Sequence, residues 1–282
     1  MRPTSKIIQG DRLYTRLLII FLLLTSHLLL FSQCFKGNTA FGPGEKLIYD
    51  VAYTVGPAWT SVAQVTFETF QETLNGKEVL HLKISGRTDP SYEFLFKVRD
   101  YFETWIDPTT FRPVKFNRNT FHDGVHALLN WFYYPNQSLA VYTIKVDNGP
   151  LQRGTFKAGP CVHDMVTSVY YPRTLNIDYL RVGTSVPIST IYNTTVTGLY
   201  MISVGKEIIE TRNGKRYHCT KFKIKMNKQI SMFKENSEVL VWFTSDANRI
   251  PVYIEAELKV GTIRVSLQNA TGLRNPNKAL LN

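Results

Sequence analysis

The sequence predicts an all-β protein: a large curved antiparallel sheet that closes into a barrel-like or sandwich structure, with one short amphipathic helix around residues 162–171. Three observations lead to this prediction. From residue 46 onward, apolar and polar residues alternate with a period of two, which is typical of half-buried strands. Asn-Gly and Asp-Gly pairs separate several of these runs, as they do in tight hairpins. Only one stretch after the N-terminal segment has the spacing of a helix.

The first element, residues 1–33, is predicted to be a signal peptide. Basic residues precede the apolar run LLIIFLLLTSHLLLF, which is shorter than the ~20 residues that a membrane-spanning helix needs. Removal of the signal peptide takes away four of the 33 Lys and Arg residues and one of the 22 Asp and Glu residues, which leaves a net charge of +8. We therefore expect an exported protein, in the periplasm, at the outer membrane or secreted, with an uncleaved signal anchor as the alternative. Gln33 stands where a lipoprotein signal has a small residue, so lipidation of Cys34 is not expected.

The strands are expected to follow one another between short turns. In KLIYDVAYTV, the side chains of Leu47, Tyr49 and Val51 share one face, and those of Asp50 and Thr54 lie on the other. The same alternation recurs along the chain. It predicts strands within 46–55, 61–70, 72–84, 92–107, 112–121, 126–134, 139–146, 185–192, 198–210, 216–226, 238–243, 249–258 and 261–268. The clearest hairpin turns are Asn75-Gly76, Asp123-Gly124 and Asn213-Gly214.

The number and spacing of the strands indicate the domain organisation. About a dozen short strands joined by short turns predict an antiparallel meander, and a sheet of that size has to curl or close. No Pro/Ser-rich linker and no change in composition divides the chain. We therefore expect a single β-rich domain at 41–273, followed by a disordered tail at 274–282.

The helix is expected in CVHDMVTSVYYPR, between the two strand-rich halves. Apolar residues fall there at the spacing of one helical face. They are Val162, Met165, Val166, Val169 and Tyr170. We expect Pro172 to end the helix. A single amphipathic helix within a large sheet is expected to plug one end of the sheet or to cover an open face.

Three residues at the start of this helix have the chemistry of a nucleophile, a base and an orienting acid: Cys161, His163 and Asp164. Cys161 and His163 are two residues apart, so in a regular helix they point to different sides and do not pair. Asp164 in the first turn complements the positive end of the helix dipole. The favoured interpretation is a polar helix start. In an oxidising compartment a disulfide between Cys161 and Cys219 is allowed, and two separate buried thiols are the alternative.

Other candidate sites carry weaker signals. His122 and His126 flank a turn, but no third ligand is indicated, so no metal site is predicted. No phosphate-binding, zinc or other cofactor motif is present in the sequence, and no cofactor is predicted. Lys221, Lys223 and Lys225 share one strand face, which either is solvated or faces a lipid or other anionic envelope component. Nothing in the sequence resembles a nucleic-acid-binding module. The oligomeric state is not indicated.

Several stretches of the sequence form an ordered set of motifs. They are GEKLIYDVAY (44–53), FKVRDYFETWIDPTTFRPVKFNRN (96–119), HDMVTSVYYPRTL (163–175), ETRNGKRYHCTKFKI (210–224) and LVWFTSDANRIPVYIEAELKVGTIRVSL (240–267). With them the chain resembles, over about residues 41–270, the exported bacterial family known as domain of unknown function 3108, and in particular its Bacteroidetes-type members. The resemblance implies a large curved β structure of barrel type, and no established activity, substrate or catalytic residue. Among the positions that recur in the family, the candidate binding residues are Asp164, Arg173, Trp242, Asp246 and Arg249.

Two functional hypotheses follow. In the first, the protein is a non-enzymatic envelope protein whose sheet holds an apolar cavity closed by the helix. It binds a hydrophobic or lipid-like ligand there, or it acts as a scaffold. In the second, it is a hydrolase that acts on envelope polysaccharide or peptide, through the Cys161, His163 and Asp164 cluster or through paired carboxylates. The candidate carboxylates are Asp89, Glu93, Asp100 and Glu103.

Overall fold

The computed structural model describes residues 35, 37–54, 59–159, 161–226 and 238–281. From Phe35 onward the chain forms one compact unit. The predicted signal peptide at 1–33 and the lipidation question at Cys34 lie outside the described residues.

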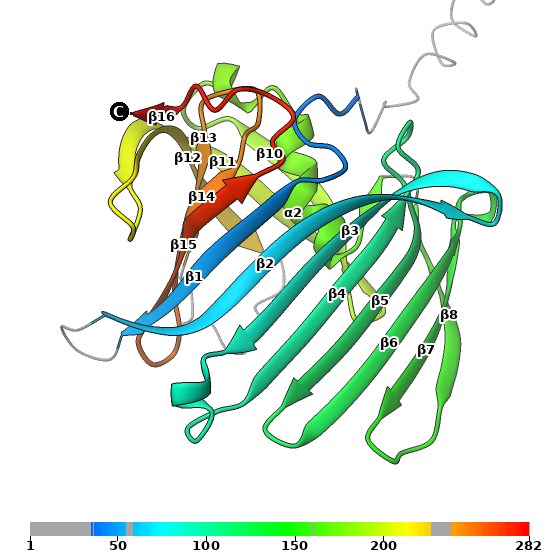
Figure 1. Ribbon diagram of the computed structural model, residues 1–282. Coiled ribbons are helices and arrows are strands. Elements are labelled where there is room, and N and C mark those ends of the chain that lie inside the picture. Colours follow the sequence, from blue (N-terminus) through cyan, green and yellow to red (C-terminus); the bar gives the residue numbers. More distant parts are fainter. Residues whose placement is uncertain (1–34, 36, 55–58, 160, 227–237, 282) are drawn as a thin grey trace, which may run out of the picture. The chain divides into compact units, whose positions relative to one another are not determined.

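Strands dominate the described part of the chain, and all of them belong to one sheet (Figure 1). Sixteen strands are present among the described residues, in the order β8-β7-β6-β5-β4-β3-β2-β1-β15-β14-β13-β12-β11-β10-β9, with β16 paired to β12. The strands are β1 Lys46–Thr54, β2 Trp59–Leu74, β3 Lys77–Thr88, β4 Val98–Ile106, β5 Pro113–His122, β6 Val125–Tyr134, β7 Leu139–Val146, β8 Gln152–Lys157, β9 Val162–His163, β10 Ser185–Tyr192, β11 Thr195–Glu210, β12 Arg216–Met226, β13 Val239–Thr244, β14 Pro251–Glu257, β15 Thr262–Thr271 and β16 Leu280–Leu281. The helices are α2 Met165–Thr174 and the single 3-10 turns η1 Pro90–Tyr92, η2 Pro135–Gln137 and η3 Ile177–Tyr179.

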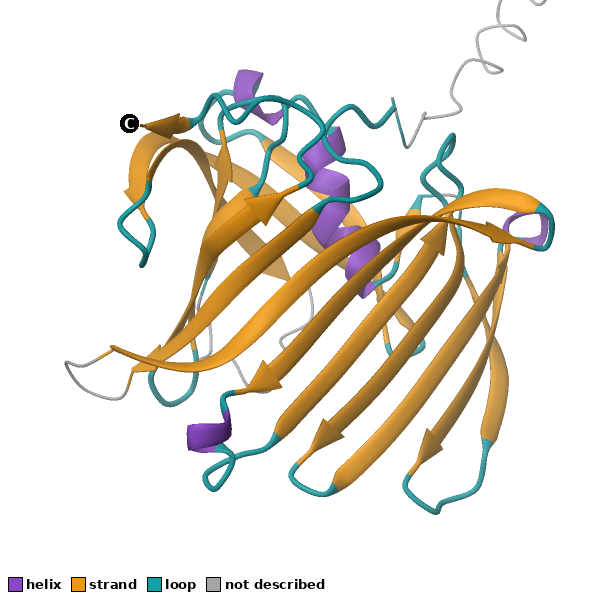
Figure 2. Cartoon of the chain, viewed as in Figure 1, coloured by secondary structure: helices purple, strands orange, loops and turns teal. Residues whose placement is uncertain are grey.

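The sheet curls strongly but does not close, because β8 and β9 remain as its two edges (Figure 2). The hairpins make an antiparallel meander, and β15 returns to pair with β1 in the middle of the sheet. Register shifts within β1, β4, β11 and β13 add bends, since a bulge increases the local twist of a strand. The prediction of an all-β, barrel-like structure is confirmed.

The predicted hairpin turns form where the sequence places them. Asn75 and Gly76 have φ values of 52° and 75°, and Asp123 and Gly124 have φ values of 48° and 96°. These left-handed conformations suit the tight turns that join β2 to β3 and β5 to β6. The short side chains of Asn and Asp tolerate such values, and glycine adopts them without a steric penalty.

The helix differs from its prediction at both ends. Helix α2 begins at Met165, after the N-cap Asp164, and Val162 and His163 form the short strand β9 instead. Pro172 lies inside the last turn and does not end the helix. A proline near the helix end removes only one backbone hydrogen bond, and the Leu175 N–H donates to the Pro172 carbonyl at 3.1 Å. The helix is also apolar on two faces, because it lies within the curve of the sheet and contacts both β3–β4 and β10.

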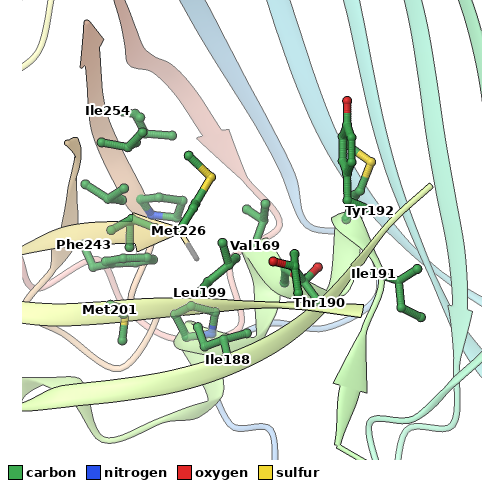
Figure 3. Close-up of a pocket in the computed structure, with 18 of the residues that line it drawn as sticks. Val169, Ile188, Thr190, Ile191, Tyr192, Leu199, Met201, Met226, Phe243 and Ile254 are labelled. Carbon is green, nitrogen blue, oxygen red and sulfur yellow. The ribbon is translucent and has the colours of Figure 1, made fainter. Parts of the chain in front are cut away.

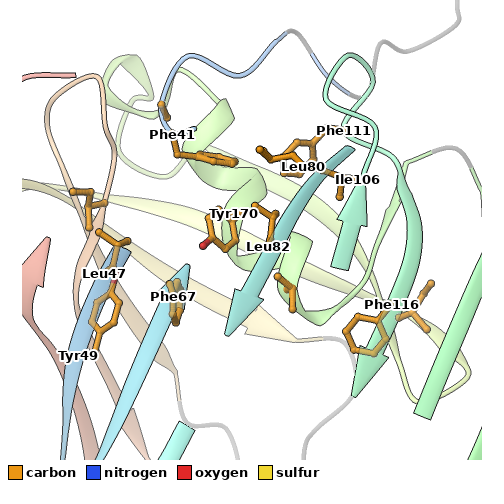
Figure 4. Close-up of a cluster of buried hydrophobic side chains, with 14 of the residues drawn as sticks. Phe41, Leu47, Tyr49, Phe67, Leu80, Leu82, Ile106, Phe111, Phe116 and Tyr170 are labelled. Carbon is orange, nitrogen blue, oxygen red and sulfur yellow. The ribbon is translucent and has the colours of Figure 1, made fainter. Parts of the chain in front are cut away.

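One face of α2 packs into the larger of two buried clusters, beneath the first strands of the sheet (Figure 4). Tyr170 of α2 meets the ring of Phe41 with centroids 4.8 Å apart and lies beside Phe67 of β2. A smaller cluster lies on the other side, where Ile188, Met201 and Phe243 pack together. The helix therefore lies between the larger buried cluster and the inner faces of β10–β14.

The C-terminal segment is not a disordered tail, which corrects the prediction for 274–282. Residues 280–281 form β16, which pairs with the start of β12. Ala279 is buried, and its N–H donates to Asp246 Oδ2 at 3.2 Å. The N–H of Asn275 donates to Asn248 Oδ1 at 3.0 Å. The segment looks polar and short in sequence, but polar groups of the β13–β14 loop hold it in place. Residue 282 lies outside the described residues.

The β10–β11 hairpin reaches the concave face of the opposite half of the sheet. Ile191, near its turn, is fully buried in the larger cluster. Asn193 in the turn accepts a hydrogen bond from Arg118 Nη1 of β5 at 3.0 Å. This hydrogen bond joins the β10–β11 turn to β5, although these strands lie far apart in the strand order.

Candidate functional site

A cavity of about 530 Å³ lies between the outer face of α2 and the inner faces of β10–β14 (Figure 3). The helix contributes Met165, Ser168, Val169 and Pro172, and the strands contribute mostly alternate residues. The strand residues are Ile188, Thr190, Ile191, Tyr192, Thr195, Thr197, Leu199, Met201, Ile224, Met226, Val239, Val241, Phe243, Pro251 and Ile254. In β11, β12 and β13 the period of two puts these side chains on one face of the strand, and the curl of the sheet turns the lining faces toward one another.

The lining of this cavity is almost entirely apolar. No charged side chain contributes to it within the part of the chain that the structure describes. Two of its polar groups already have partners, since Ser168 Oγ lies 2.6 Å from Thr190 Oγ1 and 2.7 Å from the Asp164 carbonyl. Such a lining favours hydrocarbon over water or polar solutes.

The exposed lining residues of the cavity, Tyr192 and Thr195, lie at the turn of the β10–β11 hairpin. Its base is formed by buried side chains, among them Ile188, Met201 and Phe243. Tyr192, beside the turn, is 39% exposed. A ligand would therefore enter from the end that carries Tyr192 and would reach the buried base with its apolar part.

Asp164 is the N-cap of α2 and not a cavity residue. Its Oδ1 accepts the N–H of Thr167 at 2.8 Å, and its Oδ2 accepts the hydroxyl of Thr104 at 2.7 Å. The Thr167 hydroxyl in turn accepts the N–H of Asp164 at 2.8 Å, which completes a capping box. Complete burial raises the pKa of Asp164 to about 6, and these hydrogen bonds only partly offset that rise. The residue fixes the start of the helix on β4.

Arg173 forms a fully buried ion pair with Glu45, the residue before β1. Its Nη1 and Nη2 donate to the two Glu45 carboxylate oxygens at 2.6 and 2.7 Å. Its Nε donates to the Asn248 carbonyl at 3.1 Å. Both side chains are only 1% exposed, and the guanidinium also lies 4.8 Å from the centre of the Phe41 ring. A bidentate pair of this kind binds the end of α2 to the edge of the core.

Asp246 and Arg249 belong to the loop between β13 and β14. Asp246 Oδ1 accepts the Thr244 hydroxyl at 2.9 Å and the Asn248 N–H at 3.0 Å. Arg249 Nη1 donates to the Arg173 carbonyl at 3.2 Å. The structure thus brings Arg173, Asp246 and Arg249 together around Asn248, in a network that joins the end of α2, this loop and the C-terminal segment.

Trp242 lies apart from that network. Its indole Nε1 donates to Glu207 on β11, and the Lys221 ammonium lies 4.6 Å from its ring centre. Lys221 and Lys223 are paired with Glu207 and Glu238 at 3.2 and 2.7 Å, which favours the solvated-face interpretation of the lysine row. None of the five residues predicted to bind a ligand lines the apolar cavity.

The disulfide that the sequence allows between Cys161 and Cys219 is absent. Cys219 is a buried free thiol, and Cys161 is itself disulfide-bonded. Through β9 and β10, Val162, the residue after Cys161, lies level with Gly198 of β11, whereas Cys219 is paired with Glu207 of the same strand. The nine residues between Gly198 and Glu207 correspond to roughly 30 Å of strand. A disulfide needs Cα atoms within about 7 Å.

The Cys161, His163 and Asp164 cluster does not have the arrangement of a catalytic triad. Cys161 is disulfide-bonded and supplies no thiolate. His163 is buried, and burial lowers its pKa to about 4. Its ring packs against Tyr171 with centroids 4.3 Å apart. The Asp164 carboxylate is engaged in the helix cap. The cluster is a buried helix start.

The carboxylates between β3 and β5 have separate partners. Glu93 pairs with Lys97 and Arg99, and Asp89 accepts the Ser91 N–H at the start of η1. Asp100 contacts His122 at 2.7 Å, and Glu103 lies 3.3 Å from His81. His126 contacts Asn119 at 2.7 Å. No group of three or more metal-ligating side chains is found within the described ranges.

The comparisons with known proteins identify the family. The sequence profile of the family described as Protein of unknown function (DUF3108) matches residues 48–268. The chain belongs to this family. No curated protein matches the sequence. Within the described part of this DUF3108 member, no helix combines the length and the apolar character needed to cross a membrane.

Two solved structures are similar to this DUF3108 member. One is a β-barrel-like protein with a domain of unknown function, DUF1849, from Brucella abortus, with 8% identity and a TM-score of 0.49; the match covers 82% of this chain and 98% of that chain. The other is a protein with a YmcC-like fold from Bacteroides fragilis, with 10% identity and a TM-score of 0.34; that match covers 84% and 98%.

The cavity residues of the DUF3108 chain were not predicted from sequence. Their signal is present, because Leu199 and Met201, or Ile224 and Met226, are alternate residues of predicted strands. Alternation shows that such residues share a face. It does not show that this face borders a cavity and not a filled core.

Proposed function

We propose that this protein is an exported, non-enzymatic cell-envelope protein that binds a hydrophobic or lipid-like ligand in the cavity between α2 and β10–β14. The observation that carries this proposal is the uncharged, apolar lining of a cavity of about 530 Å³. Its volume lies within the ~300–1,000 Å³ that small-molecule sites commonly occupy.

The energetics of an empty cavity support an occupant. Water fills an apolar cavity poorly, because it finds few hydrogen-bond partners there. An apolar ligand would gain about 0.8 kcal/mol for each CH₂ group that it buries in the cavity.

The first test is mass spectrometry of the protein purified from the envelope fraction of its native cells. Native spectra are expected to show a lipid-sized mass in addition to the polypeptide, and denaturing spectra of the same sample are expected to lose it. A polypeptide without any additional mass in the native spectra would contradict tight ligand binding and would favour a scaffold.

The second test is a matched pair of variants in a titration with the neutral fluorescent probe N-phenylnaphthylamine. Val169→Trp places a large ring in the cavity and is expected to weaken probe binding at least tenfold. Val182→Trp makes the same change at a position that is 70% exposed and is expected to leave binding unchanged. Equal affinity of both variants would show that the probe binds elsewhere.

A further inference from the structure

Arg118 is an unusual residue for its position in the fold. It lies on β5 two residues after the fully buried Phe116, and residues two apart in a strand share a face. Its half-buried guanidinium group is therefore on the concave face of the sheet. An arginine on such a face normally has a carboxylate partner, because burying an unpaired charge costs free energy.

Among the described residues, Arg118 forms no ion pair. Its one hydrogen bond is to the neutral side-chain oxygen of Asn193, and its Nε is buried without a partner. Asp100 lies on the neighbouring strand, but its carboxylate contacts His122 at 2.7 Å. Burial raises the pKa of Asp100, and His122 and Arg118 partly offset that rise.

The hydrogen bond to Asn193 places Arg118 beside the β10–β11 turn, next to the exposed end of the cavity. Asn193 follows Tyr192, which lines the cavity at its exposed end, and begins the turn that leads to Thr195, another lining residue. A ligand whose apolar part occupies the buried base would thus have its outer end near a guanidinium group that forms no ion pair with any described residue.

We propose that the ligand is an amphiphile with an anionic head group, and that Arg118 binds this head group at the mouth of the cavity. The inference rests on the proposed function, because it gives the polar end of the ligand whose apolar end fills the cavity. A planar guanidinium matches a carboxylate or a phosphate in geometry as well as in charge.

The test compares dodecanoate with dodecanol by isothermal titration calorimetry on the full mature chain at pH 8. The two probes share a hydrocarbon chain and differ in the charge of the head group. We expect dodecanoate to bind roughly tenfold to a hundredfold more tightly than dodecanol, as for a hydrogen bond to a charged group. Arg118→Met is expected to remove this preference and to leave the affinity for dodecanol unchanged.

Two further variants control the comparison. Lys145→Met on the exposed face of β7 removes the same charge away from the cavity and is expected to keep the preference for dodecanoate. Asn193→Asp supplies Arg118 with a carboxylate partner without altering β5, and it is expected to reduce dodecanoate binding even if Arg118→Met does not fold. Aspartate tolerates the positive φ of 56° at this position.

The outcomes separate this inference from the proposed function. Equal affinity of the wild-type protein for the two probes, or an unchanged preference in both Arg118→Met and Asn193→Asp, would overturn the role of Arg118 while leaving the apolar cavity supported. Failure of both probes to bind the wild-type protein would overturn the cavity proposal and this inference together.

Discussion

Removing one partner of the buried ion pair between Glu45 and Arg173 is expected to destabilise the protein strongly. Replacing Glu45 by Gln keeps the shape of the side chain but removes the charge that balances the guanidinium group. Arg173 then remains 1% exposed, with an uncompensated charge inside the protein. Breaking a buried pair by removing one partner costs about 3–5 kcal/mol, and we expect a cost in this range for Glu45→Gln and for Arg173→Met.

Matched variants separate this effect from a general loss of charge. Lys46 and Glu68 also form an ion pair, at 3.0 Å, but Lys46 is 46% exposed. Such surface pairs contribute about 0–1 kcal/mol, so Glu68→Gln is expected to have little effect. The double variant Glu45→Leu/Arg173→Met leaves no buried charge of this pair. It is expected to be less destabilised than the sum of the two single variants.

Urea unfolding followed by circular dichroism measures these differences. With a slope of about 3 kcal/mol per M for a protein of this size, the single variants are expected to lower the midpoint by roughly 1–2 M. If Glu45→Gln and Glu68→Gln shift the midpoint equally, or if the double variant loses the full sum, the reasoning about the buried pair is refuted.

Three further predictions concern other parts of the protein. Burial raises the pKa of Asp164 from 3.8 to about 6, so its contribution to the stability of the fold falls as the pH rises through this window. Burial lowers the pKa of His163 from 6.5 to about 4, so the contribution of His163 to stability rises with pH between these values. Urea unfolding between pH 4 and 7 is therefore expected to show stability rising more steeply with pH in Asp164→Asn than in the wild type, and unchanged slopes would contradict these pKa values. Burial raises the pKa of the Cys219 thiol, so a thiol reagent is expected to label it only after unfolding, and rapid labelling of the folded protein would show that it is accessible. Deletion of residues 274–282 removes β16 and the Ala279 hydrogen bond to Asp246, and is expected to cost about 2 kcal/mol or more; an unchanged melting temperature would argue against the packing of this segment.

The sequence by itself determined the local structure of this protein. The alternation around Leu47 and Tyr49, and its recurrence along the chain, predicts strands because it depends only on neighbours in sequence. The turns at Asn75-Gly76 and Asp123-Gly124 were predictable for the same reason, since they require residues that accept positive φ. The ordered motifs indicated the family. The helix was also predicted, but its limits were wrong, because the Asp164 cap and the pairing of β9 with β10 decide where it begins.

Only the tertiary structure decided which of these elements meet. Glu45 and Arg173 lie 128 residues apart in sequence, and no local pattern pairs them. The same holds for Cys219, whose separation from Cys161 follows from the strand order, and for the C-terminal segment, whose polar residues find partners in a distant loop. The cavity is the clearest case. A period of two assigns each side chain to a face, but the curl of the sheet and the placement of α2 decide whether the apolar faces meet in a filled core or enclose a space for a ligand.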